Sequence, residues 1–311
     1  MIRSFLKWPG GKARVMPELQ KHLPAGDCLV EPFVGGATVF LNTDYRRYVL
    51  GDINPDLINT YRVARRHTEA LIDVTNTLFR DCGTEEEYYK ARAKFNELRK
   101  GDHRALALSE ITRAALFIYL NRHCFNGVVR YSERAGFNAP YAKDQKKAPY
   151  LPDLEIRQFA EKANDTKALF LCCSFENTLQ INIGESPVIY CDPPYLPASK
   201  TSNFTEYYGG AFGAGRHRQL SAALTRAADA GCRVVLSNSD TPATREIYSQ
   251  FAMHEISVTR SIAANGKRGK VGEVIATRNA SGLGCPSGGC SGCDGQIKCF
   301  GLGADDSAEV A

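Results

Sequence analysis

Short apolar runs that alternate with helical patterns constrain the fold of this chain more than any other feature. Patterns typical of amphipathic helices occur around residues 12–22 and 216–230. The apolar runs read as strands buried on both faces: "DCLVEPF", "RYVLGDIN", "ALFLCCSF", "SPVIYCD" and "CRVVLSNS". Because strands that alternate with helices form parallel sheets with helices on both faces, the pattern predicts an α/β fold.

The stretch between the second and third of these runs is charged and reads as helical. One helix opens at "NPDLINTYRVARR", with Asn54 as its N-cap, Pro55 in its first turn and Asp56 near the positive end of its dipole. "EEEYYKARAKFNELRK" and "ALALSEITRAALFIYL" predict further helices, and after about Asn279 the text becomes rich in Gly, Ser and Cys. We therefore predict an α/β domain at 1–54 and 156–279, an inserted domain at 55–155 and a flexible tail at 280–311.

Composition limits the setting and the partners of the protein. The formal net charge of +5 permits a nucleic-acid partner without requiring one. The first residues lack the apolar region of a secretory signal, and no apolar run is long enough to span a bilayer. We therefore expect a cytoplasmic protein with no membrane partner, in which cysteines outside the tail are reduced.

The run "SPVIY" leads directly into "CDPPY", residues 191–195. An acid at the carboxyl end of a buried strand stands where doubly wound sheets bind ligands. Pro193 and Pro194 stiffen the backbone and lack an N–H, so the corner offers mainly carbonyl acceptors, and Tyr195 adds a flat face for stacking. These groups suit a planar molecule with an amino group, which can donate to Asp192 and to the Pro193 carbonyl. A proline-ended loop with a capping aspartate explains a lone Asp-Pro-Pro-Tyr about equally well.

Further segments point to a nucleotide-like ligand. "LVEPFVGGATVF" is a strand, a glycine turn and a helical pattern, and Asp52 ends the next strand, where an acid can accept from ribose hydroxyls. "FLKWPGGKAR" places Trp8, the only tryptophan, before a Gly-Gly turn flanked by Lys7 and Lys12. Each segment alone has an ordinary explanation: helix packing for the glycines, a helix cap for Asp52 and a plain turn for the N-terminal segment.

Taken together, these segments make the chain resemble the DNA adenine-N6 methyltransferases of the Dam type. The resemblance runs from about residue 4 to 279 through "FLKWPGGK", "LVEPFVGG", "GDIN", "YLNR", "FNGVVRY", "FNAPY", "CDPPY", "NFTEYY" and "SNSDT". It implies a Rossmann-like sheet that uses S-adenosylmethionine, and an inserted, mainly helical DNA-recognition domain that carries a β-hairpin. It also implies methyl transfer to N6 of adenine in duplex DNA, by base flipping and direct in-line transfer.

The resemblance assigns roles to individual residues. The catalytic motif corresponds to Asp192, Pro193, Pro194 and Tyr195. Cofactor binding falls to Trp8, Gly10, Lys12, Phe33, Gly35 and Asp52, with Asp192 contributing to both. Hydrogen bonds from the amine to Asp192 and to the Pro193 carbonyl would direct the nitrogen lone pair at the methyl group, so no cysteine needs to act as a nucleophile.

The segment "HCFNGVVRY" predicts how DNA is read. Asn126-Gly127 is a strong hairpin-turn signal, and a two-stranded ribbon fits the major groove. Residues 122–147 contain six Lys or Arg against two acids, with aromatic residues interleaved. Without the resemblance, a solvated surface hairpin is the better explanation of this stretch.

With the resemblance, six residues become candidate DNA contacts. Arg130 would read a guanine, Val128 would lie beside a thymine, and Lys7 would touch the first guanine. Phe125 stands where the family inserts a tyrosine ring, Asn126 is unchanged, and Pro140 occupies another base-contacting position. The predicted target is GATC, and the departures at Val128 and Phe125 leave altered specificity open.

The tail and the wider setting allow alternatives. Cys285, Cys290, Cys293 and Cys299 could hold a structural zinc, but a flexible tail without metal is favoured over it. A methyltransferase that acts on RNA or on a protein glutamine amide, and a non-catalytic DNA-binding module, are the competing functions. The basic hairpin argues against the first, and intact Asp192, Tyr195 and Asp52 argue against the second. We expect a monomer that acts on double-stranded DNA in a bacterium, or encoded by a phage or plasmid, and leave a cognate restriction endonuclease open.

Overall fold

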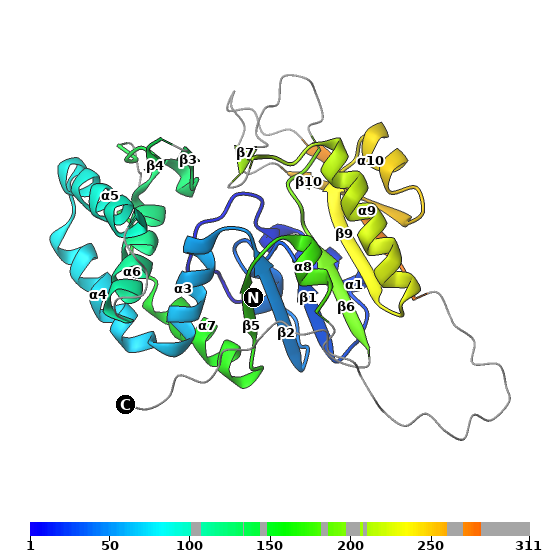
Figure 1. Cartoon of the computed structure of the whole chain (residues 1–311), viewed down its shortest axis with the longest axis horizontal. Helices are drawn as coiled ribbons and strands as arrows, with labels where there is room; N and C mark the ends of the chain where they lie inside the picture. Colours follow the sequence, from blue (N-terminus) through cyan, green and yellow to red (C-terminus); the bar gives the residue numbers. More distant parts are fainter. Residues whose placement is uncertain are drawn as a thin grey trace, which may run out of the picture. The chain divides into compact units, whose positions relative to one another are not determined.

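A seven-stranded sheet forms the centre of the molecule in the computed structural model (Figure 1). Its order is β10-β11-β9-β6-β1-β2-β5, and β11 runs in the direction opposite to the other six strands. The strands are β1 (Cys28–Glu31), β2 (Arg47–Asp52), β5 (Leu169–Cys172), β6 (Pro187–Cys191), β9 (Arg233–Ser239), β10 (Ala252–Thr259) and β11 (Lys270–Arg278). All five predicted strands are present as β1, β2, β5, β6 and β9, which confirms the predicted α/β fold, whereas β10 and β11 were not predicted.

The structure describes most of the chain. The described residues are 1–100, 107–132, 134–143, 148–181, 186–196, 206–207, 210–259 and 270–280. Met1–Ser281 forms one compact unit, and residues 282–311, which include Cys285, Cys290, Cys293 and Cys299, lie outside the described residues. The predicted zinc alternative at these cysteines therefore stays a prediction.

Alternating residues of the strands build a separate hydrophobic core on each face of the sheet. Leu29, Leu50 and Tyr190 point into one core, which also receives α1 (Met16–His22), α3 (Pro55–Arg66) and α7 (Asp153–Asp165). Val30 and Ile189 point into the other, which is covered by α8 (Phe175–Leu179), α9 (Ala214–Asp229) and α10 (Pro242–Ile247). Burial on both faces explains why these strands read as continuous apolar runs.

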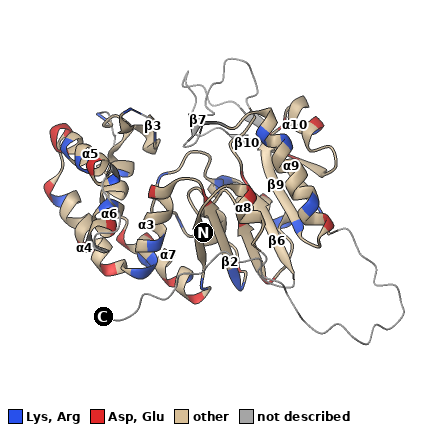
Figure 2. Ribbon diagram, in the orientation of Figure 1, with Lys and Arg blue, Asp and Glu red and all other residues tan. Residues whose placement is uncertain are grey.

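A group of helices lies beside the β5 end of the sheet (Figure 1). It comprises α4 (Thr68–Asp81), α5 (Glu85–Lys100) and α6 (Ala107–His123), and α3 contacts both α6 and the strands β2 and β5. Asn54 caps α3 as predicted, since its side chain accepts from the backbone N–H groups of Asp56 and Leu57. Acidic and basic residues are interspersed over these helices (Figure 2). The proposed boundaries of the inserted domain, 55–155, stay a prediction.

The hairpin of this region lies later in the chain than predicted. Asn126-Gly127 belongs to η2 (Phe125–Gly127), a tight turn with positive φ of 55° and 66°, and the segments on either side of it do not form a hairpin. The paired strands are instead β3 (Tyr131–Ser132) and β4 (Gly136–Phe137). The prediction of a hairpin at Asn126-Gly127 was therefore wrong. Cys124, two residues before Asn126, is buried and bridges to Tyr141, so the chain before the turn pairs with a later segment.

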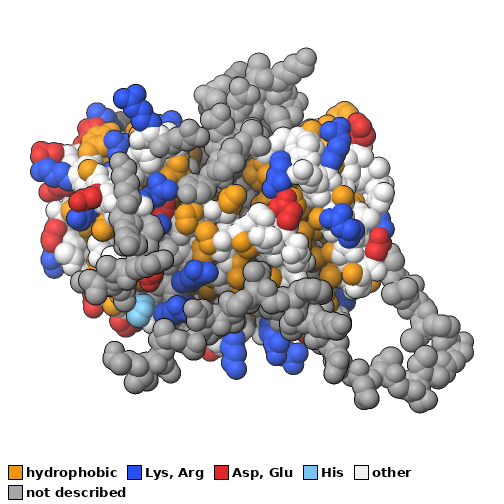
Figure 3. Space-filling view, viewed as in Figure 1, with side chains coloured by type: hydrophobic (Ala, Val, Ile, Leu, Met, Phe, Trp, Pro, Cys, Tyr) orange, Lys and Arg blue, Asp and Glu red, His pale blue; other side chains and the backbone are white. Residues whose placement is uncertain are grey.

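Short elements complete the described chain: η1 (Lys12–Arg14), α2 (Thr38–Leu41), β7 (Glu206–Tyr207) and β8 (Gly210–Ala211). None of the described helices is long and apolar enough to cross a bilayer. The seven cysteines in the described ranges are free thiols, as expected. In the space-filling view, hydrophobic side chains gather between the helical group and α9, while side chains of both charges surround them (Figure 3).

Candidate active site

The strand order changes direction between β1 and β6. The chain proceeds from β1 to β2 and β5 in one direction, and β6 and β9 extend the sheet in the other. Open α/β sheets bind ligands at the carboxyl ends of strands that flank such a switch in direction. β1 ends at Glu31 and β6 ends at Cys191, so Asp192 lies at the edge where this rule expects a site.

Lys12 joins the predicted catalytic corner directly. Its Nζ lies 2.7 Å from Asp192 Oδ2, donates to the Gly10 carbonyl at 2.9 Å and stands 5.0 Å from the centre of the Tyr195 ring. Lys12 is only 6% exposed, so the ion pair is largely shielded from water. The structure thus brings Lys12 and Gly10, predicted to hold the cofactor, to Asp192 and Tyr195.

Asp192 keeps one oxygen free of these contacts. Its Oδ1 is buried and has no hydrogen-bond partner among the described residues. Burial raises the pKa of Asp192, and the charge and hydrogen bond of Lys12 oppose that rise. A buried acceptor without a partner is costly unless a ligand satisfies it. Asp192 Oδ1 is therefore suited to a donor that arrives with the substrate.

The rest of the corner is held from β9 and β11. Tyr195 Oη donates to Glu273 Oε2 at 3.1 Å. Leu196 N donates to Asn238 Oδ1 at 3.3 Å, and Ser239 Oγ donates to the Leu196 carbonyl at 2.7 Å. These bonds fix the backbone that follows the two prolines.

The glycine turn and Asp52 form a second group at the neighbouring strand ends. Gly35 has φ of +44°, and a Cβ at this position would lie 2.9 Å from Trp8 Nε1, so a larger residue does not fit. Gly35 N donates to Asp52 Oδ2 at 3.1 Å, and Asn54 N donates to Asp52 Oδ1 at 3.0 Å. Burial raises the pKa of Asp52 to about 6, against these hydrogen bonds. Trp8, Gly35 and Asp52 are thus brought together, as predicted.

Phe33 contributes an aromatic surface at the end of β1. Its ring stacks on Phe175 and meets Phe212 edge-on, each at 5.6 Å between ring centres. Ile53, directly after Asp52, is 47% exposed. Apolar surfaces beside a carboxylate that can accept from hydroxyls suit a nucleoside.

Glu31 is a buried acid to which the sequence analysis gave no role. It is 2% exposed, and its Oε1 has no hydrogen-bond partner among the described residues. Burial, and to a lesser extent the charge of Asp192, raise its pKa to about 8. The signal in the sequence is an acid inside the otherwise apolar run "LVEPF".

The predicted DNA contacts gather around η2 and the β3–β4 hairpin. Lys7 Nζ donates to the Arg122 carbonyl at 2.9 Å, and its stem packs so closely on Gly127 that a Cβ there would collide with it. Phe125 is 59% exposed, and its N–H donates to the Pro140 carbonyl at 3.0 Å. Lys7, Phe125 and Pro140 therefore lie near one another although they are distant in sequence.

Arg130, Asn126 and Val128 complete this group. Arg130 is exposed, and its Nε donates to Asn138 Oδ1 at 2.8 Å. Asn126 is exposed at the tip of its turn, and Val128 is half-buried, with its N–H donating to the Phe125 carbonyl at 3.2 Å. All six candidate contacts are described, and each is at least partly accessible to solvent.

Comparison with known proteins agrees with this geometry. Residues 8–262 match the model of the D12 class N6 adenine-specific DNA methyltransferases. The chain is 41% identical to the DNA adenine methylase of Escherichia coli K12 over 276 residues, which cover 88% of this chain and 94% of that protein. It is also 41% identical to the DNA adenine methylases of Serratia marcescens and Vibrio cholerae, with 97% and 95% of those proteins covered. The chain belongs to the D12 class of N6 adenine-specific DNA methyltransferases.

Membership settles the class of reaction. The protein is an adenine-specific DNA methyltransferase, so it needs a methyl donor and takes DNA as its substrate. This confirms the predicted family and enzyme class. The comparisons favour it over the alternatives of an RNA or glutamine methyltransferase and of a non-catalytic DNA-binding module.

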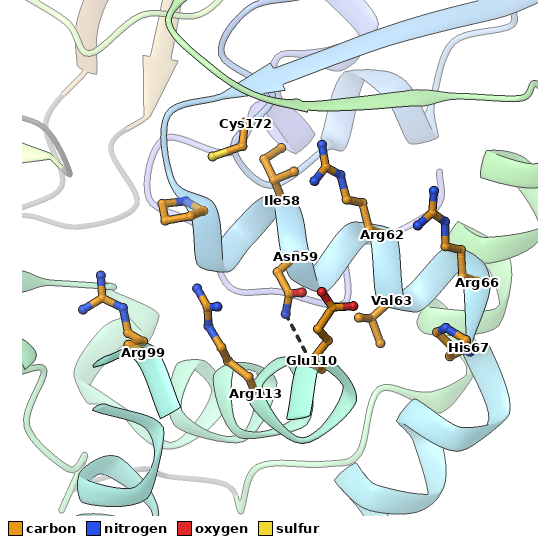
Figure 4. Close-up of a pocket in the computed structure, with 11 residues that line it drawn as sticks. Ile58, Asn59, Arg62, Val63, Arg66, His67, Arg99, Glu110, Arg113 and Cys172 are labelled. Carbon is orange, nitrogen blue, oxygen red and sulfur yellow. Dashed lines mark hydrogen bonds between the residues drawn. The ribbon is translucent and has the colours of Figure 1, made fainter. Parts of the chain in front are cut away.

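A cavity of about 370 Å³ in this methyltransferase lies between α3 and α6, and none of its lining residues is a predicted site residue (Figure 4). Arg62 and Arg66 project from α3, and Arg99 and Arg113 approach it from α5 and α6. The buried carboxylate of Asp56 pairs with Arg99 at 2.9 Å and with Arg113 at 2.6 Å. The charges of Arg99 and Arg113 therefore hold α5 and α6 to α3 through Asp56.

No group of three or more potential metal ligands occurs within the described ranges. Besides Glu31, sequence reasoning missed residues that reach the corner from distant elements, namely Glu273 and His217. Neither stands in a local pattern that differs from an ordinary strand or helix.

Proposed function

We propose that this methyltransferase transfers the methyl group of S-adenosylmethionine to N6 of an adenine within GATC, after that base has flipped out of the duplex. The observation that carries the proposal is the buried Asp192 Oδ1, which lacks a partner in the described chain and lies at the switch point of the sheet. The two prolines beside it have no N–H, so an amine meets acceptors there.

The residues around the glycine turn suit S-adenosylmethionine. Asp52 would accept from the ribose hydroxyls, since each carboxylate oxygen has a second lone pair beside the one used by a backbone N–H. Trp8, Phe33 and Gly35 would shape the surface around the cofactor. The bound cofactor would supply a sulfonium methyl group, whose bond to sulfur breaks as the bond to the adenine nitrogen forms.

Asp192 and Pro193 would prepare the nitrogen for this reaction. The lone pair of an adenine amine is delocalised into the ring, so the amine is a poor nucleophile. Hydrogen bonds from its two hydrogens to Asp192 Oδ1 and the Pro193 carbonyl would favour a pyramidal nitrogen with a directed lone pair. The nitrogen then loses one proton, which Asp192 would pass to water. Lys12 holds the carboxylate in place through Oδ2.

Base flipping follows from the position of the corner. The Asp192 side chain is only 20% exposed, so an adenine stacked in a duplex would not reach it. Lys12 lies over the Tyr195 ring, and we infer that Tyr195 stacks on the flipped adenine, a contact worth roughly 1–3 kcal/mol.

The group of Lys7, Phe125 and Arg130 would read the sequence around the adenine. Arg130 would exchange its bond to Asn138 for a guanine, and Lys7 would contact the first guanine. The exposed Phe125 ring would insert into the base stack. Asn126, Val128 and Pro140 would line the same surface. Monomeric action in the cytoplasm and a cognate restriction endonuclease stay predictions from the sequence.

Substitution of Asp192 tests the catalytic assignment. We expect Asp192→Ala to abolish transfer of label from tritiated S-adenosylmethionine to a GATC duplex, while calorimetry shows cofactor binding largely retained. Asp73→Ala, on the exposed face of α4, is the matched control and should keep full activity. Activity in Asp192→Ala would refute the assigned role.

A further inference from the structure

His217 reaches the catalytic corner from the first turn of α9. The side chain is fully buried, at 0% exposure. Its Nε2 lies 3.0 Å from the carbonyl oxygen of Pro194, and its Nδ1 lies 2.9 Å from Tyr248 Oη. The ring also meets Phe212 edge-on at 4.9 Å. An imidazole held on both nitrogens inside the core is fixed in orientation as well as in place.

The two partners determine where the proton on the ring resides. A carbonyl can only accept, so Nε2 must carry the hydrogen that is donated to Pro194. Burial lowers the pKa of His217 to about 4, so near neutral pH the ring is uncharged and has a single N–H. Nδ1 is then an acceptor, and Tyr248 Oη donates to it. The Pro194 carbonyl therefore sets the tautomer, and Tyr248, whose hydroxyl can donate or accept, donates to the ring nitrogen that carries no hydrogen.

This bond distinguishes the two carbonyls of the corner. Pro193 and Pro194 offer adjacent carbonyl oxygens and no N–H. His217 satisfies the carbonyl of Pro194, while that of Pro193 accepts no hydrogen bond from the described residues. Leu196, two residues on, is held separately by Asn238 and Ser239. His217 is therefore the side chain that fixes the orientation of the Pro194 peptide.

We propose that His217 is a positioning residue for methyl transfer, which binds the Pro194 carbonyl so that the Pro193 carbonyl and Asp192 face the target amine, and that the hydroxyl of Tyr248 holds the ring in the orientation this requires. The inference rests on the proposed function of the Asp192 corner. His217 does not touch the substrate, and it acts through the geometry of the backbone. Small misplacements of reacting groups are costly, with about 100-fold lost for roughly 1 Å.

Paired substitutions at position 217 separate positioning from packing. His217→Gln keeps an amide N–H for Pro194 and an amide oxygen for Tyr248, whereas His217→Leu fills the space without either group. In single-turnover assays with saturating S-adenosylmethionine and GATC duplex, we expect His217→Leu to be about 10–100-fold slower. We expect His217→Gln to recover most of the rate, and the Kd values for cofactor and DNA to stay within about threefold of wild type. Equal rates for the two variants, or a loss confined to Kd, would overturn the proposal.

Tyr248→Phe tests whether the hydroxyl acts through the His217 ring. It should slow the single-turnover rate in the wild-type background and have little further effect in His217→Leu, because the hydroxyl acts through the ring. Additive effects would overturn this part of the proposal. Tyr45→Phe is the matched control, since Tyr45 is a buried tyrosine whose hydroxyl donates to the Pro24 carbonyl at 2.7 Å, before β1 and away from the corner. Nitrogen-15 spectra of labelled histidine should show His217 protonated on Nε2 both in the wild type and in Tyr248→Phe, because the Pro194 carbonyl can only accept.

The outcomes also separate this proposal from the proposed function. An active Asp192→Ala variant would refute the catalytic corner itself. An inactive Asp192→Ala variant together with a fully active His217→Leu variant would refute only the role of His217. If His217→Leu does not fold, the rate of His217→Gln and the wild-type spectrum still decide, because a protonated Nδ1 in the wild type would refute the geometry.

Discussion

Asp56 should contribute more to the stability of this methyltransferase than any surface acid. Its side chain is 0% exposed and accepts from Arg99 Nε at 2.9 Å, from Arg113 Nε at 2.8 Å and Nη2 at 2.6 Å, and from Tyr131 Oη at 2.8 Å. One carboxylate thus joins α3 to α5, α6 and strand β3. The substitution Asp56→Ala removes all of these bonds at once.

The size of the loss follows from the burial of the partners. Removal of one member of a buried ion pair costs about 3–5 kcal/mol, because the remaining charge stays away from water. The side chains of Arg99 and Arg113 are 19% and 13% exposed, so each retains limited access to water after the substitution. We therefore expect a loss near the lower end of that range, about 3 kcal/mol.

Urea unfolding followed by circular dichroism measures this loss. Asp56→Ala should lower the transition midpoint with little change in the slope of the free energy against urea. Asp56→Asn should fall between it and wild type, since the amide oxygen still accepts hydrogen bonds. Asp73→Ala, on the exposed face of α4, should leave the midpoint unchanged. A loss of unfolding free energy below about 1 kcal/mol in Asp56→Ala would refute the reasoning, because a loss of that size is typical of a solvent-exposed ion pair.

Three further predictions concern the site. Burial raises the pKa of Asp52 to about 6, and only its ionised carboxylate accepts from the ribose hydroxyls. Calorimetry should therefore show an affinity for S-adenosylmethionine that falls roughly tenfold per pH unit below pH 6, and an affinity independent of pH would contradict this. Gly35→Ala should displace Trp8, which the fluorescence of this single tryptophan reports, and should weaken cofactor binding; an unchanged spectrum with full affinity would contradict the packing. Arg130→Ala should reduce discrimination at one guanine by about 1–3 kcal/mol in competition assays, whereas a uniform loss would make Arg130 a phosphate contact.

The strands and the helix cap could be predicted because their signals are local. The five strands could be predicted from apolar runs, because a strand that is buried on both faces is apolar along its length. The cap could be predicted because Asn54 stands directly before a proline and an acid. The candidate site also followed from strand ends, since Asp52 and Asp192 each come directly after an apolar run. Because the strands are parallel, their carboxyl ends and the residues that follow them lie at one edge of the sheet.

The hairpin shows where local signals fail. Asn126-Gly127 does adopt the positive φ angles that its sequence favours. A turn sets the local path of the chain but does not decide which segments pair. Tertiary contacts decide that here, since Cys124 bridges to Tyr141 and the N–H of Phe125 donates to the Pro140 carbonyl.

The side chains that hold the Asp192 corner could not be predicted from the sequence, for a different reason. His217 and Glu273 come from α9 and β11, and they reach Pro194 and Tyr195 across long separations in sequence. Each stands in an ordinary helical or strand pattern. Their partners become visible only once the elements are packed.

The central claim is that the Asp192 corner methylates adenine in a defined duplex site. The most direct test is transfer of tritium from labelled S-adenosylmethionine to two duplexes, one with a single GATC and one with that site scrambled, followed by digestion to nucleosides. The account predicts label on N6-methyladenine from the GATC duplex alone. Equal label on both duplexes would contradict the recognition surface around Lys7, Phe125 and Arg130, and no label on either, with the cofactor bound, would contradict the proposed function.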